Sequence, residues 1–253
     1  MNRPSFLKNV SLGKTPVQAT SAEKQKNSPP LTSGTKKAPG LYQRLAHLYQ
    51  RMENAYAACA REAGLSCAGC PTNCCTSFFQ HHTYVEWSYL WRGLSELAPQ
   101  RRQELIRRAE NYMRDANQAI ALNALPNAMC PLNEEGLCIL YPYRLMICRL
   151  HGTRNVFTRP DGFQQVFPGC ARFTALPCST GNFPSAPASE TPTAPPQNAG
   201  ASGSHPCPTL DRTPFYAELA ALEMEFHKRA AGPLPRVNLT LAEMIVLGPP
   251  RLR

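Results

Sequence analysis

Four cysteines stand within nine residues of this chain, and their spacing points to metal chemistry. They are Cys67, Cys70, Cys74 and Cys75. A packed core does not require such a cluster, because adjacent cysteines cannot both point into one apolar face. A Cys-x-x-Cys turn lets two sulfur atoms converge on one ion, and Gly69 and Pro71 suit the tight backbone around it. The cluster therefore predicts a metal site and says much less about what the metal is for.

A second set of cysteines lies further along the chain and completes the count of donors. It comprises Cys130, Cys138, Cys148 and Cys170. Together the two sets give eight potential thiolate ligands, enough for two four-coordinate sites or for one cluster plus a separate ion. Because the adjacent Cys74 and Cys75 point in divergent directions, they serve different metals more easily than one metal, or one of them stays outside the coordination shell.

The spacing of the cysteines does not decide between zinc and iron. Thiolate-only ligation suits structural zinc, and it suits iron–sulfur clusters such as 4Fe-4S equally well. The opening is not the Cys-x-x-x-Cys-x-x-Cys of radical S-adenosylmethionine enzymes, because the order of the spacings is reversed, and no glycine-rich nucleotide loop accompanies it. A full disulfide framework is the competing interpretation, and without a sign of secretion it is not favoured.

Several residues around the second set recur in an order and spacing that resembles a known family. After the opening cluster come Cys130-Pro131-Leu132, Cys138, Tyr141, Arg144, Cys148 and Arg149, then Cys170 with Phe173. Over about residues 60–175 this pattern resembles the CxxCxxCC (YkgJ-like) family of zinc- or iron-chelating domains, which includes the flagellin lysine N-methylase. The chain departs from the family pattern in two places: three residues separate Cys70 from Cys74, and Leu145 stands where the family usually has proline.

Four further residues are expected near the sulfur atoms: Tyr141, Arg144, Arg149 and His151. A zinc ion with four thiolates carries a net charge of about minus two, and a thiolate-ligated iron–sulfur cluster is also anionic, so burial requires nearby cations and N–H donors. Arg144 and Arg149 bracket Cys148 and can supply both. For His151, packing or a hydrogen bond to a ligand sulfur is favoured over ligation, because the cysteines already satisfy the count.

The remaining histidines and cysteines are weaker candidates. His81 and His82 directly precede a predicted helix cap, and His47 and His227 are expected on helix surfaces. Cys59 falls on the apolar face of a helix and is expected in the core. Cys178 and Cys207 bracket a proline-rich insertion, which suggests an ancillary pair, with two free thiols as the alternative.

The periodicity of the chain predicts a mainly α fold, in which a small helical domain surrounds a cysteine-rich metal core. Helices are expected over residues 41–63, from Thr83, over 99–122, over 214–231 and from Thr240 to about Gly248. Thr83 with Glu86, and Thr240 with Glu243, match capping boxes. One short β-hairpin is expected, with residues 156–158 and 163–167 joined by Arg159-Pro160-Asp161-Gly162.

The composition divides the chain into four parts. Residues 1–39 read as a disordered basic tail, since residues 1–40 carry +6 of the formal charge of +10. Residues 40–178 form the cysteine-rich domain, 179–210 a proline-, serine- and alanine-rich linker, and 211–253 C-terminal helices that pack on the domain. The tail could contact nucleic acid or acidic lipid weakly, but a solvated extension is favoured.

These observations predict a protein that chelates zinc or iron through eight thiolates. The resemblance adds a second hypothesis, a metal-dependent enzyme that methylates protein lysines, although no acid–base pair or cofactor loop is apparent. A third hypothesis is a metal-stabilised adaptor that docks a protein partner through the tail or the C-terminal helices. The sequence shows neither a signal peptide nor an apolar run long enough to span a bilayer, so a cytoplasmic, reducing location is expected.

Overall fold

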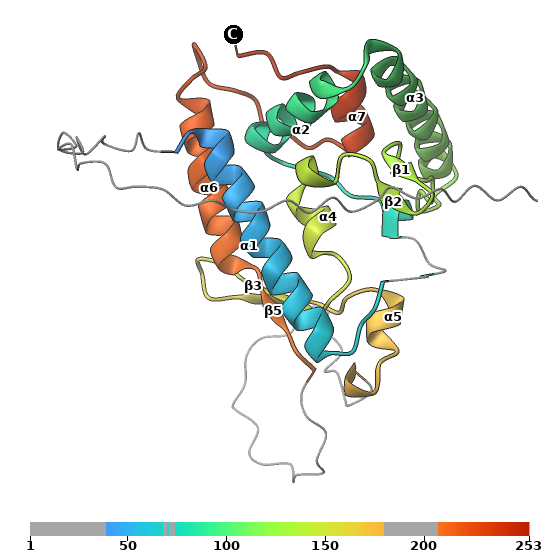
Figure 1. Ribbon diagram of the computed structural model, residues 1–253, viewed down its shortest axis with the longest axis vertical. Helices are drawn as coiled ribbons and strands as arrows, with labels where there is room; N and C mark the ends of the chain where they lie inside the picture. Colours follow the sequence, from blue (N-terminus) through green and yellow to red (C-terminus); the bar gives the residue numbers. More distant parts are fainter. Residues whose placement is uncertain (1–38, 68–69, 71–73, 180–206, 253) are drawn as a thin grey trace, which may run out of the picture. The chain divides into compact units, whose positions relative to one another are not determined.

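The computed structural model describes residues 39–67, 70, 74–179 and 207–252, and in this part the chain is mainly helical (Figure 1). The α-helices are α1 (Leu41–Glu62), α2 (Tyr84–Glu96), α3 (Pro99–Ala121), α4 (Met146–Leu150), α5 (Ala171–Thr174), α6 (Thr213–His227) and α7 (Leu241–Val246). Short 3-10 turns are η1 (Cys74–Thr76), η2 (Tyr141–Tyr143) and η3 (Pro177–Ser179). The expected mainly α fold is confirmed. The predicted tail, and nearly all of the predicted linker, lie outside the described residues.

Helix α1 forms where an apolar stripe recurs at steps of three and four residues. Leu41, Leu45, Leu48 and Met52 are buried along that stripe. The helix ends at Glu62, and Gly64, two residues further on, has a φ of +72°, so the predicted stop at this glycine is confirmed. The N–H of Leu65 bonds the carbonyl of Ala60 at 2.8 Å, and that of Gly64 bonds Arg61 at 3.1 Å, so the last carbonyls of the helix are satisfied. The chain then turns directly into the first cysteine cluster.

Helix α2 begins after Thr83 as predicted, but its predicted capping box is wrong. The backbone N–H groups of Tyr84 and Val85 donate instead to the carboxylate of Glu223 on α6, at 2.8 Å each. Glu86 is buried and points into the core, where it accepts from other donors. A carboxylate from a distant helix has replaced the local one, which a local motif cannot anticipate.

The C-terminal helices share the core of the preceding ones. Helix α6 lies alongside α1, and α7 packs against α3 (Figure 1). Two indole N–H groups, from Trp87 and Trp91, donate to the carbonyl of Met244 on α7, at 3.0 Å and 2.8 Å. The predicted capping box of α7 is confirmed, since Thr240 Oγ1 accepts from the Glu243 N–H and the Glu243 carboxylate accepts from the Thr240 N–H.

Short strands complete the described part, and only one pair of them was predicted. The hairpin of β3 (Asn155–Thr158) and β4 (Gln164–Phe167) is antiparallel, with Thr158 opposite Gln164, and confirms the prediction. Strand β5 (Leu210–Asp211) adds in parallel to β3. Strands β1 (Asn133–Glu134) and β2 (Leu137–Cys138) form a second, unexpected hairpin. Two-residue strands carry no periodic signal, so the sequence did not reveal them.

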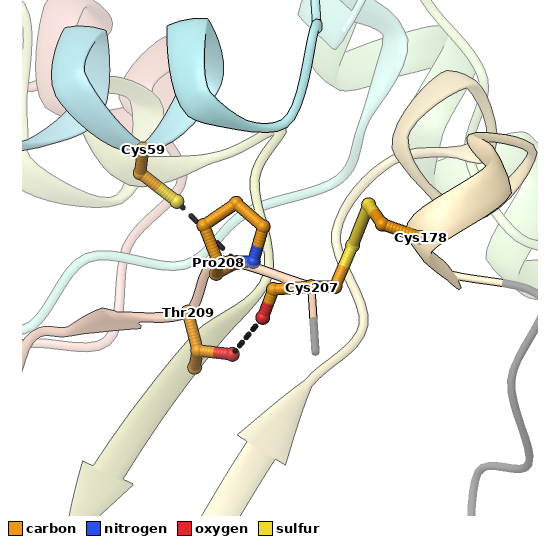
Figure 2. Close-up of a disulfide and its surroundings, with 5 residues drawn as sticks. All are labelled: Cys59, Cys178, Cys207, Pro208 and Thr209. Atoms are coloured by element: carbon orange, nitrogen blue, oxygen red, sulfur yellow. Dashed lines mark hydrogen bonds between the residues drawn. A yellow bond between two sulfur atoms is a disulfide. The ribbon is translucent and has the colours of Figure 1, made fainter. Parts of the chain in front are cut away.

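Cys178 and Cys207 are joined by a disulfide (Figure 2), so the suggested pairing is confirmed and the alternative of two free thiols is wrong. Their Cα atoms are 4.8 Å apart, and the bond ties η3 to the segment that leads into β5. Beside it, the thiol of Cys59 donates to the carbonyl of Pro208 at 3.5 Å. Cys59 is 8% exposed, which confirms its predicted place in the core.

Candidate metal centre

Five of the predicted cysteines line one small cavity of about 60 Å³. They are Cys74, Cys75, Cys130, Cys138 and Cys148. Cys74 and Cys75 come from η1, Cys138 from β2 and Cys148 from α4. The fold thus gathers residues that are far apart in sequence around a space of atomic size.

Local backbone contacts bring these cysteines together. The N–H of Cys130 bonds the carbonyl of Cys75 at 2.9 Å, which joins the two predicted sets directly. In the β1–β2 hairpin Cys138 pairs with Asn133. That hairpin is fixed to α3 by Glu134, which accepts from both Arg101 and Arg108. Two arginines of α3 therefore anchor the hairpin that carries Cys138.

The other three predicted cysteines, Cys67, Cys70 and Cys170, line a larger cavity of about 500 Å³. Cys74, Cys75 and Cys138 line this cavity as well as the small one. The hydroxyl of Tyr56 lies 3.6 Å from the sulfur of Cys67, at hydrogen-bonding distance for sulfur. All eight predicted thiols therefore line one cavity or the other, and the adjacent Cys74 and Cys75 stand where the two meet.

Shared lining is not the same as a formed coordination shell. Across residues 39–67, 70, 74–179 and 207–252, no group of three or more His, Cys, Asp or Glu side chains is placed to hold a metal ion. The donor types themselves fit a soft or borderline metal such as zinc or iron, because thiols are the most numerous donors in the lining and the imidazoles of His81 and His151 accompany them. The described side chains supply suitable donors, but not in a coordinating arrangement.

Burial keeps most of the inner thiols protonated. It raises the pKa of Cys130 and Cys138, and it raises the pKa of Cys148 to about 12, although the charge of Arg144 favours the thiolate forms of Cys138 and Cys148. Cys75 is the exception, through its contact with Cys74. A hydrogen bond between them raises the pKa of Cys74 and lowers the pKa of Cys75 to about 6, helped by the Asn133 side chain and by Arg144. Metal binding here would therefore release protons at neutral pH.

The two arginines near Cys148 have different environments. Arg144 lines both cavities and donates from Nη2 to the backbone carbonyl of Cys148. Arg149 is buried and uses its donors on backbone carbonyls, those of Arg144 at 2.6 Å, Pro142 at 2.9 Å and Tyr141 at 3.0 Å. Arg144 is thus placed to offset thiolate charge, whereas the hydrogen bonds of Arg149 hold the turn that leads into α4.

Tyr141 and His151 were expected near the sulfurs, and both line a cavity, but within the described residues neither makes a hydrogen bond to a cysteine sulfur. The hydroxyl of Tyr141 donates to Glu53 at 2.9 Å, and its ring lies at the larger cavity. His151 lines both cavities and packs its ring against Phe79, with centroids 5.0 Å apart. Burial lowers the pKa of His151, so its imidazole is neutral at pH 7.

His81, which the sequence placed among the weaker candidates, also lines the small cavity. It is 1% exposed, it lines the cavity, and its Nδ1 has no hydrogen-bond partner. Burial and then the neighbouring His82 lower its pKa to about 3, so the ring is neutral. Its backbone is held by an antiparallel bridge to Leu239, with N–O distances of 2.7 Å and 3.1 Å. This long-range bridge holds His81 in its buried position, and the residues next to His81 in the sequence do not predict the bridge.

None of the helices in the described residues is both long enough and apolar enough to cross a membrane. The resemblance of the cysteine pattern to the CxxCxxCC family rests on the residues quoted above. No protein-family model matches the chain, and no curated protein or solved structure matches it either.

Proposed function

We propose that this chain is a thiolate metal-binding protein that holds zinc or iron, the iron as an ion or as an iron–sulfur cluster. The observation that carries the proposal is the small cavity, whose lining combines five cysteines with the unpartnered imidazole of His81. Apolar side chains would fill such a space at lower cost than buried thiols and an unsatisfied ring nitrogen. Donors gathered in this way have a ready explanation if they share an ion.

The residues divide into two groups of ligands in this proposal. The small cavity offers the sulfurs of Cys130 and Cys148 and Nδ1 of His81. The larger cavity offers Cys67, Cys70 and Cys170. Cys74, Cys75 and Cys138 line both, so they can complete either group. Two adjoining centres, or one centre with a neighbouring thiol-rich space, are both compatible with this division.

The same residues determine how many protons leave when metal binds and how the negative charge of the thiolates is offset. Bound zinc supplies a cross-link between distant segments, and a bound iron–sulfur cluster supplies one-electron chemistry. Burial of the thiols means that their protons leave as ligands form, and Arg144 lies at both cavities to offset part of the negative charge that results. The side chains must also rotate to converge, because no coordinating group is already formed in the described residues.

Membership of the CxxCxxCC (YkgJ-like) family is part of the proposal, and it is supported by the order of the cysteines and of Tyr141, Arg144 and Arg149 in the sequence. A cytoplasmic location is proposed on the ground that thiolate ligands persist in a reducing compartment. The Cys178–Cys207 disulfide argues in the other direction, since disulfides are commoner in oxidising compartments. A non-reducing peptide map of protein from cells would show which environment the chain occupies.

The proposal is tested by metal analysis of the full chain, purified without oxygen and without added chelator. We expect about one or two equivalents of zinc or iron for each chain. A visible absorption band from thiolate-to-iron charge transfer would assign iron, and a colourless metal-loaded protein would assign zinc. Protein that is free of metal and yet has its native helical content would contradict the proposal.

A further inference from the structure

A third cavity, of about 450 Å³, lies next to the thiol-lined ones and contains none of the predicted cysteines. Three aromatic side chains line it: Phe79, Phe167 and Tyr216. Arg212 and Asn155 line it too. Neither Arg212 nor Asn155 is among the proposed metal ligands, so the polar groups of this cavity need a separate explanation.

Arg212 is a buried cation with no anionic partner among the described residues. It is 9% exposed, and its Nε is buried without a hydrogen-bond partner. The guanidinium carbon lies 3.5 Å from the ring centroid of Phe167 and 5.3 Å from that of Tyr216, so the group is held by stacking. Burial lowers the pKa of Arg212, yet an arginine stays charged at any physiological pH.

The nearest acidic residue in sequence, Asp211, has a different partner in the described residues. The carboxylate of Asp211 accepts from the N–H of Thr213 at 2.8 Å, which satisfies a donor at the start of α6. Arg212 is itself fixed through its backbone, whose N–H donates to the carbonyl of Val156 at 3.0 Å. The cation is therefore positioned at the cavity by its backbone and by two rings.

Asn155 presents the complementary group. It is 3% exposed, and its Nδ2 donates to the carbonyls of Leu150 at 3.0 Å and Thr153 at 2.6 Å. These two bonds fix the orientation of the amide, and they leave Oδ1 buried without a partner. An unsatisfied buried acceptor is costly unless a donor reaches it. The cavity thus combines a fixed cation, a fixed acceptor and an aromatic wall.

We propose that this cavity binds a small organic carboxylate that also carries a hydroxyl or amino donor and an apolar ring or chain. The planar guanidinium of Arg212 matches a carboxylate with two parallel hydrogen bonds. The donor of the ligand reaches Oδ1 of Asn155, and its apolar part contacts Phe79, Phe167 and Tyr216. A carboxylate is favoured over a phosphate ester because, among the described residues, Arg212 is the one arginine or lysine that lines the cavity. The imidazoles of His82 and His151 line it as well.

The test uses the metal-containing full chain and 4-fluoromandelate, which carries a carboxylate, an α-hydroxyl and a ring, with binding followed by fluorine NMR line broadening. We expect saturable broadening that excess mandelate reverses and that mandelamide, the neutral analogue, does not reverse. Arg212→Met should weaken binding by about tenfold or more, as loss of a charged hydrogen-bonding partner does. Arg212→Lys keeps the charge but loses the planar guanidinium with its two parallel donors. Its affinity for 4-fluoromandelate should lie between those of the wild type and Arg212→Met.

Arg159 provides the matched control, because it is an arginine of the neighbouring hairpin that also lies over a ring, that of Phe163. Its side chain is 54% exposed and it does not line the cavity, so Arg159→Met should bind 4-fluoromandelate as the wild type does. Three results would overturn the proposal: no saturable binding by the wild type, equal competition by mandelamide, or unchanged affinity in folded Arg212→Met. Tighter binding of phenyl phosphate than of mandelate would overturn the choice of a carboxylate. The first two comparisons need only wild-type protein, so they decide even if the variants fail to fold.

Discussion

Replacing Cys148 with serine is expected to strip the bound metal from the purified protein. Cys148 lies on α4 at the small cavity, with the guanidinium of Arg144 on its own backbone carbonyl. A serine hydroxyl is a poor ligand for zinc or iron in a thiolate site. Loss of a direct ligand should cost more than the 10- to 100-fold in affinity that is typical of losing an outer-shell partner, so we expect a decrease of more than about 100-fold.

Cys59→Ser is the matched control for this experiment. Cys59 is a buried cysteine of the same chain, but it donates to the carbonyl of Pro208 and lines neither thiol cavity. Serine can make the same hydrogen bond, so metal content should stay at the wild-type level. Metal content is measured on both variants after identical purification, together with their far-ultraviolet circular dichroism. Full metal content in Cys148→Ser would contradict the assignment of Cys148 as a ligand.

The second large effect is expected at Glu86, which joins three elements of the core. Its carboxylate accepts from the hydroxyl of Tyr49 on α1 at 2.8 Å, from the hydroxyl of Thr83 at 2.8 Å and from the N–H of Met146, the first residue of α4, at 2.7 Å. Glu86→Ala leaves three donors without an acceptor in a buried position. At about 1–3 kcal/mol for each unsatisfied group, we expect a loss of about 3 kcal/mol or more in the free energy of unfolding, measured by urea denaturation.

Glu86→Gln separates the lost hydrogen bonds from the lost charge. Its amide oxygen can accept from Tyr49 and Met146, and its NH₂ can donate to the hydroxyl of Thr83, so nearly all of the stability should be retained. Because α4 carries Cys148, Glu86→Ala should also weaken metal binding, whereas Glu86→Gln should not. Equal destabilisation by the two substitutions would show that the carboxyl group has a role other than accepting these three bonds.

The pH dependence of this difference has a defined sign. Burial raises the pKa of Glu86 above its ordinary value, so the folded protein holds this proton more tightly than the unfolded chain does. Its contribution to stability is therefore complete below the ordinary pKa of about 4 and is lost as the pH rises through the raised pKa of the folded state. Relative to Glu86→Gln, the wild type should lose stability as the pH rises from about 4 towards neutrality. A wild type that gained stability relative to Glu86→Gln as the pH rose would contradict this assignment.

The sequence predicted the elements whose signals are local. The stripe of Leu41, Leu45, Leu48 and Met52 located α1, and the glycine at position 64 located its end. The turn around Gly162, with a φ of +83°, located the β3–β4 hairpin. In each case the residues that determine the structure lie within a few positions of one another, so propensity and turn chemistry are sufficient.

The features that the sequence missed depend on contacts between distant residues. Glu223 rather than Glu86 caps α2, because α6 packs beside it. His81 is buried by its bridge to Leu239, and Arg212 is buried by its stacking on Phe167. Each of these side chains would be ordinary on a helix or loop surface. The unsatisfied nitrogens of His81 and Arg212 can be recognised only once the fold has brought their neighbours into place.

The candidate metal centre falls between these two cases. The cysteine spacing gave the donor set, and the fold brings all eight cysteines to two adjoining cavities. The sequence could not show that Cys130 joins the first cluster through a backbone bond to Cys75, nor that an imidazole faces the same space. Both follow from how the loop after α3 and the strand-like segment at His81 are held.

The measurement that tests the central claim most directly is X-ray absorption fine structure at the edge of the metal that co-purifies with the full chain under anaerobic conditions. Thiolate ligation by the cysteines of the two cavities predicts a first shell dominated by sulfur at about 2.3 Å from the metal. A first shell made only of oxygen and nitrogen, at about 2.0–2.2 Å, would contradict it.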